Sequence, residues 1–486
     1  MKYTFIMNWN FSYQKVSVFM FVLFAVVMGI FLHRIPGLMG DEASEGENVY
    51  ELLSLETITV TGERSYIGPV IDYVRVPFVW LFGYSVLGVR VPMYLFSLAG
   101  FWLALLSLRK LFGEHLSLYV MAFYSFSLPF LSFQRLGWAI TLFPFFAWLI
   151  VYLLLSEYRY KYLLAGLVAG LGLANHVIFL PTLVAIACIW LVAMIVTRRA
   201  ELVRAWPALI GFWAGFGMQF VVLLTETSDQ GDPSLVAKTM FDRFSDLSAL
   251  LPLLVSGSSY VARYTGAEFS PLVALGVTGL VGAFALMSLF AVRKYSVVTL
   301  LVLGIFIQMF VLLYMIDRFT LRYFAMPVYW LYLLAGIGFG AVLEWVFSRL
   351  KMSAHYLPPL VISIGFACML FWLVIIPFAV NGGSVNDFSL GNRTNSAKDL
   401  ADTRGLITCL EGVENVSSDN IHIFNRLQYL SHSNSRLSIL PQEEYKSSVY
   451  EVIYRDGKTK GVEDLPELCP ELRHFMVIPN RSRSLE

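Results

Sequence analysis

Long apolar runs separated by short charged stretches dominate the chain. Each run approaches the ~20 residues that an α-helix needs to cross a bilayer, so each predicts a membrane span. We expect eleven spans, at residues 16–33, 83–108, 115–132, 138–156, 160–176, 177–197, 203–224, 270–291, 296–316, 322–347 and 357–379. The fifth and sixth meet at LANHVIFLP, which indicates a tight turn or a broken helix. The pattern predicts an all-α polytopic membrane bundle.

Three longer polar segments interrupt this pattern, at residues 34–82, 225–269 and 381–486. The second contains KTMFDRFSDLSALLPLL, whose apolar residues recur at helical spacing. The third contains the runs IHIF, SSVYEVIY and HFMVIP, which indicate short strands with some helix. We therefore expect a transmembrane domain at residues 1–380, followed by a small α+β domain at residues 381–486.

Loop charges predict the orientation of the bundle. If the N-terminus is cytoplasmic, every inner segment is basic and carries some of these residues: Lys2, Lys15, Arg109, Lys110, Arg159, Lys161, Arg198, Arg199, Arg204, Arg293, Lys294, Arg349 and Lys351. We therefore expect a multi-pass protein of the cell (inner) membrane. Its N-terminus is expected to be cytoplasmic, and its three long polar segments and C-terminus are expected to be external.

Composition narrows the possible classes of function. The chain is 57% hydrophobic, and its charged residues make up 14%, against roughly 25% in soluble domains. Its net charge of +1 offers no basic surface for nucleic acid. Cys188 and Cys368 lie in predicted spans, whereas Cys409 and Cys469 lie in the external tail. Because two cysteines outside the cytoplasm usually pair, we expect a disulfide between the tail cysteines.

The first polar segment opens with the acidic stretch RIPGLMGDEASEGENVYELL. Asp41 precedes a run that predicts a helix, so it is suited to cap that helix, and an acidic first turn suits the helix dipole. A carboxylate at the membrane boundary is also suited to act as a general base or to hold a cation. Adjacent helical side chains point about 100° apart. If one of Asp41 and Glu42 acts in chemistry, the other is expected to be structural.

Few cations lie in the outer turns, and three of them are candidate phosphate ligands: Arg135, Arg318 and Arg322. A guanidinium can clamp a phosphate with two parallel hydrogen bonds. The alternative is that these arginines extend to the membrane interface. Tyr323 can add a hydroxyl contact, although interfacial tyrosines are common. His176, at the outer end of the fifth span, is a candidate contact to a donor or metal, or else a satisfied turn residue.

Four stretches in this order resemble the C superfamily of glycosyltransferases. They are GDE at 40–42, GPVIDYVRVPFVWLFGYSVLGVRVP at 68–92, SFQRLGWAITLFPFF at 132–146 and DRFTLRYFAMPVYWLYLLAG at 317–336. Within that superfamily the chain is similar to the branch of protein O-mannosyltransferases and lipid A aminoarabinose transferases. The resemblance covers residues 1–380 and leaves the tail unassigned.

The resemblance implies an inverting transferase with a periplasmic active site. Its donor is a polyprenyl-phosphate sugar, and its acceptor is a lipid, a glycan or a protein. Asp41 and Glu42 match the family's catalytic pair, with Asp41 as the base. Because the leaving group is a lipid phosphate, cations must stabilise it. The substrate-binding candidates are Arg135, His176, Arg318, Arg322 and Tyr323.

The chain departs from the aminoarabinose branch just before Pro69. That branch has an acid and a lysine there, whereas this chain has Ile67 and Gly68. We therefore carry over neither a metal at that position nor aminoarabinose as the sugar. The sequence has no HExxH motif and no closely spaced His or Cys ligands. No cofactor is required by the sequence, and a divalent cation is left open.

Two other classes use many spans. A polysaccharide (O-antigen) polymerase or ligase takes the same lipid-linked donors, but its large outer loop tends to lie late in the bundle. A lipid-linked-sugar flippase or transporter is expected to carry ionisable residues in mid-membrane and often internal repeats. Here the notable ionisable residues lie at the outer ends of spans, and we find no repeat. Both classes remain alternatives.

The orientation is testable by cysteine labelling. An impermeant thiol reagent applied from outside is expected to label a cysteine placed at Ser44 and to miss one placed at Ser348. The opposite labelling pattern would place the acidic stretch on the cytoplasmic side and overturn the argument for an external site.

Overall fold

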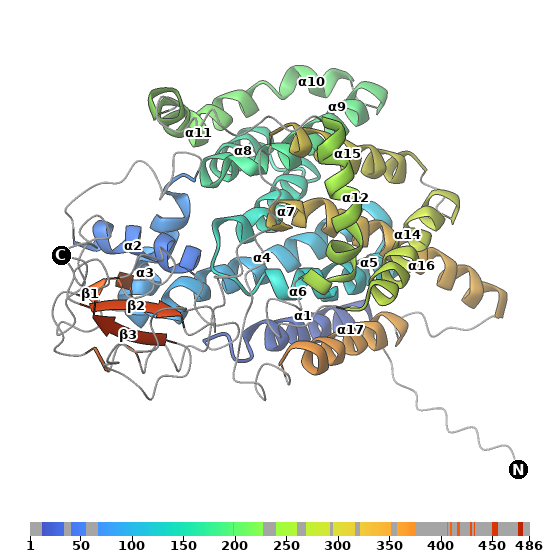
Figure 1. The fold of residues 1–486 in the computed structure, drawn as a ribbon. Coiled ribbons are helices and arrows are strands. Elements are labelled where there is room, and N and C mark those ends of the chain that lie inside the picture. The colour runs from blue at the N-terminus through green and yellow to red at the C-terminus, as the bar shows by residue number, and fades with distance from the viewer. Residues whose placement is uncertain are drawn as a thin grey trace, which may run out of the picture.

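The computed structural model describes most of the bundle and short pieces of the tail. The described ranges are 12–33, 40–54, 67–197, 199–226, 240–259, 269–291, 295–315, 321–350, 357–375, 406, 409–410, 416–417, 428–429, 432, 450–454 and 475–479. Figure 1 shows the helices gathered into one bundle, with the strands at the same end of the molecule as α2 and α3.

Helices make up nearly all of the described bundle. The α-helices are α1 (Tyr13–Gly29), α2 (Gly40–Leu53), α3 (Val70–Phe82), α4 (Val86–Phe112), α5 (Glu114–Phe126), α6 (Leu128–Phe133), α7 (Phe143–Leu154), α8 (Lys161–Asn175), α9 (Leu180–Thr197), α10 (Arg199–Arg204), α11 (Pro207–Glu226), α12 (Met240–Ser256), α14 (Pro271–Ala291), α15 (Tyr295–Met315), α16 (Ala325–Leu350) and α17 (Leu357–Leu370). Short helical turns are η1 (Ala139–Leu142), η2 (Val177–Phe179), η3 (Leu321–Phe324) and η4 (Phe371–Ile375).

Six helices within the described residues are long and apolar enough to cross a membrane. They are Val86–Phe112, Val177–Thr197, Glu201–Thr225, Pro271–Phe290, Val297–Met315 and Arg322–Leu350. Shorter apolar helices lie at Tyr13–Gly29, Ala139–Leu154, Lys161–Asn175, Ser245–Ser256 and Leu357–Leu373. A mostly helical membrane fold is therefore confirmed, whereas the count of eleven spans stays a prediction.

Two predicted spans differ from single straight helices. The predicted span 115–132 is broken at Ser127, whose hydroxyl accepts a hydrogen bond from the Phe130 amide at the start of α6. The predicted break at LANHVIFLP is confirmed, because α8 ends at Asn175 and His176 adopts extended backbone before η2. Both breaks matter because the segments that follow them contribute Gly137 and His176, which lie near Glu42 and Tyr323.

The core of the bundle lies along α5 and α16. Every residue from Leu116 to Phe126 in α5 is buried, as is almost the whole first half of α16. The rings of Phe123 and Phe339 join the two helices at a centroid distance of 5.1 Å.

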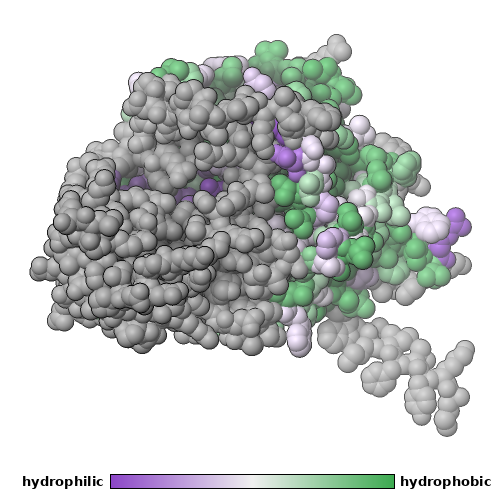
Figure 2. Space-filling model, viewed as in Figure 1, coloured by the Kyte–Doolittle hydropathy of each residue, from purple (hydrophilic) through white to green (hydrophobic). Residues whose placement is uncertain are grey.

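Peripheral helices instead turn large apolar side chains outward, such as Leu272 at 82% exposure and Phe306 at 68%. Hydrophobic residues cover much of the described surface in Figure 2, which is the surface a bilayer requires.

Glycines allow α8 and α11 to approach very closely. A Cβ added at Gly166 would lie 2.0 Å from the Ala208 carbonyl oxygen, and one at Gly211 would lie 2.0 Å from the Leu163 carbonyl oxygen. Side chains contribute little hydrophobic driving force between helices in lipid, so small residues that permit backbone contact are a common means of association.

The second polar segment contains the expected helix, α12. Leu247, Leu254 and Val255 are buried against the bundle. The Tyr332 hydroxyl donates to the Val255 carbonyl over 2.7 Å, and Arg243 donates to the Leu313 carbonyl at the end of α15 over 2.7 Å. The helix is therefore packed into the bundle along one face.

The tail contains a three-stranded sheet within its described residues. β1 (Val416–Ser417) pairs in parallel with β2 (Tyr450–Tyr454), which pairs antiparallel with β3 (Phe475–Pro479). The strands expected in SSVYEVIY and HFMVIP are thus present, whereas IHIF lies outside the described residues. An independent external α+β domain stays a prediction.

The cysteines agree with part of the disulfide prediction. Cys188 and Cys368 are free, and Cys409 is disulfide-bonded. Cys469, its predicted partner, lies outside the described residues.

The close approach of α8 and α11 predicts a difference between two glycines of one helix. Gly211→Ala forces a methyl group onto the Leu163 backbone and is expected to destabilise the protein by about 1–3 kcal/mol. Gly217→Ala on the same helix meets nothing within 4 Å and is expected to be nearly neutral. Thermal unfolding of the purified variants measures both effects, and equal stabilities would contradict the packing argument.

Candidate active site

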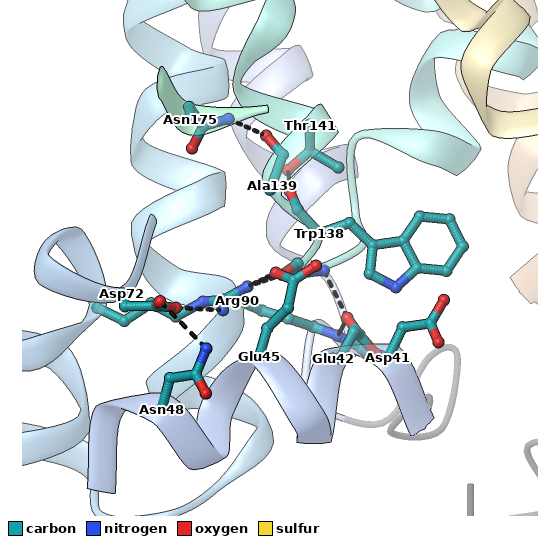
Figure 3. A network of polar contacts seen from close by, with 12 residues as sticks. Asp41, Glu42, Glu45, Asn48, Asp72, Arg90, Trp138, Ala139, Thr141 and Asn175 are labelled. Carbon is teal, nitrogen blue, oxygen red and sulfur yellow. Dashed lines mark hydrogen bonds and ion pairs between the residues drawn. The ribbon is translucent and has the colours of Figure 1, made fainter. Parts of the chain in front are cut away.

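The acidic stretch forms α2, whose first turn contains Asp41 and Glu42. Because α2 begins at Gly40, Asp41 lies inside the first turn and is not the cap that the sequence suggested. Figure 3 shows these two side chains leaving the helix in different directions, as helical periodicity requires. Glu42 is fully buried, whereas the Asp41 side chain retains 23% of its exposure. The two acids therefore occupy different environments and are suited to different roles.

Glu42 forms a bidentate ion pair with Arg90 of α4. Arg90 Nε lies 2.8 Å from Glu42 Oε1, and Arg90 Nη2 lies 2.6 Å from Glu42 Oε2. Both side chains are fully buried. Arg90 also donates to the Leu32 carbonyl just beyond α1 over 3.2 Å. This pair joins α2 and α4 to the outer end of α1.

A second buried pair lies one turn further along α2. Arg75 of α3 donates to Glu45 over 2.8 Å, and its other terminal nitrogen lies 3.8 Å from Asp72. Asn48 donates to Asp72 over 3.3 Å. All three charged side chains are buried, so these contacts connect α2 and α3 out of reach of bulk water.

The backbone of Gly137 connects the two pairs. Its amide donates to Glu42 Oε1, and its carbonyl accepts from Arg75 Nη2. A Cβ at this position would lie 3.0 Å from Glu42 Oε1. Glycine therefore lets the turn between α6 and η1 approach both ion pairs.

On the other side of α2, Asp41 forms an ion pair with Arg322 of η3. Their side chains keep 23% and 22% of their exposure, so the pair is accessible from solvent. The Arg322 guanidinium lies 5.1 Å from the Trp138 ring centroid and 5.6 Å from that of Tyr323. The arginine is therefore held between two aromatic rings with its charge directed at Asp41.

His176 and Tyr323 lie next to this pair. Their ring centroids are 6.0 Å apart, and the Phe143 ring lies 5.9 Å from His176 on another side. His176 Nδ1 accepts a hydrogen bond from the Ile178 amide over 3.1 Å, so the imidazole also caps η2. The structure thus brings Asp41, Arg322, Tyr323 and His176 into one neighbourhood.

Arg135 takes a different position. Its buried guanidinium donates to the Val27 carbonyl over 2.6 Å, to the Met28 carbonyl over 3.1 Å and to the Ile30 carbonyl. These are contacts that cap the C-terminal end of α1. Arg318 lies outside the described residues. Phosphate binding by either arginine stays a prediction.

Sequence reasoning missed the partners of the acidic helix. Arg75 and Arg90 each lie in a VRVP sequence, at 74–77 and 89–92. In both sequences an arginine stands among apolar residues beside a predicted membrane span. Because a buried charge without a partner is unstable, this pattern indicates that each arginine pairs with a buried acid. That signal could have identified both arginines, although nothing in it selects Glu42 or Glu45 as the acid.

Among the described residues, no group of three or more His, Cys, Asp or Glu side chains is arranged to hold a metal ion. The carboxylates of the site are instead engaged by guanidinium groups.

No protein-family model and no curated protein matches the chain. The fold is similar to the crystal structure of ArnT from Cupriavidus metallidurans in the apo state, with 12% identity, a TM-score of 0.61 and coverage of 97% of this chain and 99% of that chain. The ArnT structure bound to undecaprenyl phosphate gives 13% identity, a TM-score of 0.61 and coverage of 95% and 98%. The chain therefore shares the fold of ArnT over nearly its whole length, in agreement with the fold that the sequence resemblance implied.

Glu42→Gln is expected to destabilise the whole fold. Removing one partner of a buried ion pair leaves the other charge uncompensated, which costs about 3–5 kcal/mol. Asp41→Asn, at the partly exposed pair, is expected to change stability by less than about 1 kcal/mol. Thermal unfolding in detergent compares the two, and Glu42→Gln combined with Arg90→Gln is expected to recover part of the loss. Equal unfolding temperatures for the two single variants would contradict this division of roles.

Proposed function

We propose that this protein is an inverting glycosyltransferase of the cell membrane. It transfers a sugar from a polyprenyl-phosphate donor to a lipid, glycan or protein acceptor on the external face. The observation that carries this proposal is the Asp41–Arg322 pair, a carboxylate and a guanidinium in contact at a solvent-accessible position. Inverting transfer from a lipid phosphate requires both groups, one for the nucleophile and one for the leaving group.

The proposed reaction is a single displacement. The acceptor oxygen or nitrogen attacks the anomeric carbon as the bond from that carbon to the phosphate oxygen breaks. Asp41 takes the proton from the acceptor, and the polyprenyl phosphate leaves with the bonding electrons. Arg322 stabilises the negative charge that develops on the phosphate.

The Asp41–Arg322 contact supports an order of events. A phosphate that enters the site competes with Asp41 for the Arg322 guanidinium. When Arg322 turns to the phosphate, Asp41 loses a cationic partner that favours its ionised form, and it becomes a stronger base. Donor binding therefore prepares the carboxylate for the acceptor's proton.

An apolar cavity supports a lipid-linked donor. It has a volume of about 220 Å³ and lies between α4, α7, α9, α15 and α16, with Trp148, Trp190 and Trp330 among its lining residues. Trp330 is eight residues after Arg322, or about 12 Å along a helix. A hydrocarbon chain attached to a phosphate at Arg322 can reach this cavity along α16. In ArnT, undecaprenyl phosphate is a bound ligand.

Glu42 has a positioning role in this proposal. Its bidentate pair with Arg90 and its contact with Gly137 fix the rotation of α2, which sets the direction of Asp41. Tyr323 and Trp138 orient Arg322 through their rings.

Asp41→Asn is expected to abolish most of the transfer. Asparagine keeps the size of the side chain but removes the proton acceptor, so turnover is expected to fall by about 10²–10⁴-fold. Glu51→Gln, exposed on the same helix, is the matched control and is expected to retain the parent rate. The measurement is turnover of a polyprenyl-phosphate sugar by purified variants. A parent rate for Asp41→Asn would leave the acidic helix with a structural role only.

Arg322→Ala is expected to weaken binding of polyprenyl phosphate. A hydrogen bond to a charged group contributes about 1.5–3 kcal/mol, so the Kd is expected to rise by about 10–100-fold. Arg135→Ala is the comparison: the loss of its contacts with α1 predicts lower stability, and its Kd tests the phosphate role predicted from the sequence. Binding and unfolding temperature are measured on both variants. A larger loss of affinity in Arg135→Ala would reassign the phosphate site to Arg135.

A further inference from the structure

We infer that Gln428, Tyr429 and His432 of the tail form a clamp on α2 and act as positioning residues for Asp41. The inference rests on the proposed function for its kinetic readout. It gives the tail, which the sequence resemblance leaves unassigned, a direct part in the active site.

In one half of the clamp, Gln428 and His432 contact Glu47. Gln428 Nε2 donates to Glu47 Oε1 over 2.9 Å, and His432 Nε2 lies 2.6 Å from the same oxygen. The His432 ring also stacks on Tyr50 of α2, at a centroid distance of 3.6 Å and an interplanar angle of 8°. Two tail side chains thus contact the Glu47 carboxylate. The stacked His432 ring also holds Tyr50, one turn further along α2.

The other half of the clamp is Tyr429, which is fully buried. Its ring lies against Gly46, where an added Cβ would approach Tyr429 Cε2 to 2.6 Å. Its hydroxyl donates to the Ser85 carbonyl over 3.0 Å, and burial raises the pKa of this phenol, so it stays a protonated donor. Tyr429 therefore joins α2 to the turn that precedes α4.

These contacts lie on the turns that carry the catalytic acids. Gly46 is four residues after Glu42 and lies next to it on the surface of α2, so Tyr429 packs beside the Glu42–Arg90 pair. Ala43, next to Glu42, packs in the same small apolar cluster as Tyr429. Glu47 is six residues after Asp41, which corresponds to about 9 Å along the helix.

A helix held from two sides has a fixed tilt and rotation. The buried ion pairs attach α2 to α3 and α4, and the clamp attaches it to the tail. If the clamp is released, α2 can pivot about its ion pairs, and Asp41 moves relative to Arg322. A displacement of about 1 Å at a reacting group can cost up to 10²-fold in rate.

A pair of small changes tests the clamp. Gly46→Ala pushes the Tyr429 ring outward, and Tyr429→Ala removes the ring; each is expected to lower kcat by about 10–100-fold with little change in the donor KM. The double variant is expected to lose no more than Tyr429→Ala alone, because the added methyl meets the ring that this variant removes. Glu51→Gln is the control on the same helix. A raised acceptor KM with unchanged kcat would instead make the tail an acceptor-binding element and overturn the inference.

Hydrogen exchange provides a readout that needs no substrate. In full-length Tyr429→Ala, amides of α2 are expected to exchange faster than in the parent, while those of α4 keep their rates. Unchanged exchange in α2, or an equal rise in both helices, would overturn the clamp. If the parent protein transfers no sugar from a polyprenyl phosphate, the proposed function fails, and the exchange experiment still tests the clamp on its own.

Discussion

The arrangement of the helices around α2 depends on the cost of burying charge. Arg75 and Arg90 are fully buried, and an isolated charge in such a place would destabilise the fold by many kcal/mol. Each guanidinium therefore needs a carboxylate, and α2 supplies both, through Glu45 and Glu42. A short and weakly hydrophobic helix is in this way fixed against membrane helices by its acids.

That constraint also separates the roles of neighbouring residues. Because Glu42 must turn inward to meet Arg90, helical geometry sends Asp41 toward Arg322 and solvent. The inward acid stabilises the fold, and the outward acid remains accessible to a substrate. One acidic turn thus provides both an anchor and a candidate base, and the anchor determines where the base points.

The sequence predicted the elements whose signal is local. Apolar runs located the helices, the acidic stretch located α2, and the polar pair at Asn175–His176 located a break between two helices. The same periodicity predicted that Asp41 and Glu42 would diverge. These results depend on residues within a few turns of one another, so a single chain without relatives is enough to find them.

Partners that are distant in sequence could not be found in this way. Arg135 lies in an outer turn, but the direction of its side chain depends on the turn of 134–138 and on the end of α1, which is 108 residues earlier at Val27. The contact between Tyr429 and Gly46 likewise joins two segments whose sequences contain no sign of each other. Such contacts follow from the folded backbone and not from local pattern.

The wide spacing of the partners has a consequence for biosynthesis. The partners of α2 leave the ribosome in sequence: Arg75 follows Glu45 by 30 residues, Arg90 follows Glu42 by 48, and Arg322 follows Asp41 by 281. At about 5–20 residues per second, the last interval corresponds to about 15–55 seconds. The anchors of the helix can thus form early in translation, whereas the arginine that faces Asp41 arrives late. In a nascent chain, α2 can therefore be held by its buried ion pairs well before Arg322 is synthesised and completes the site.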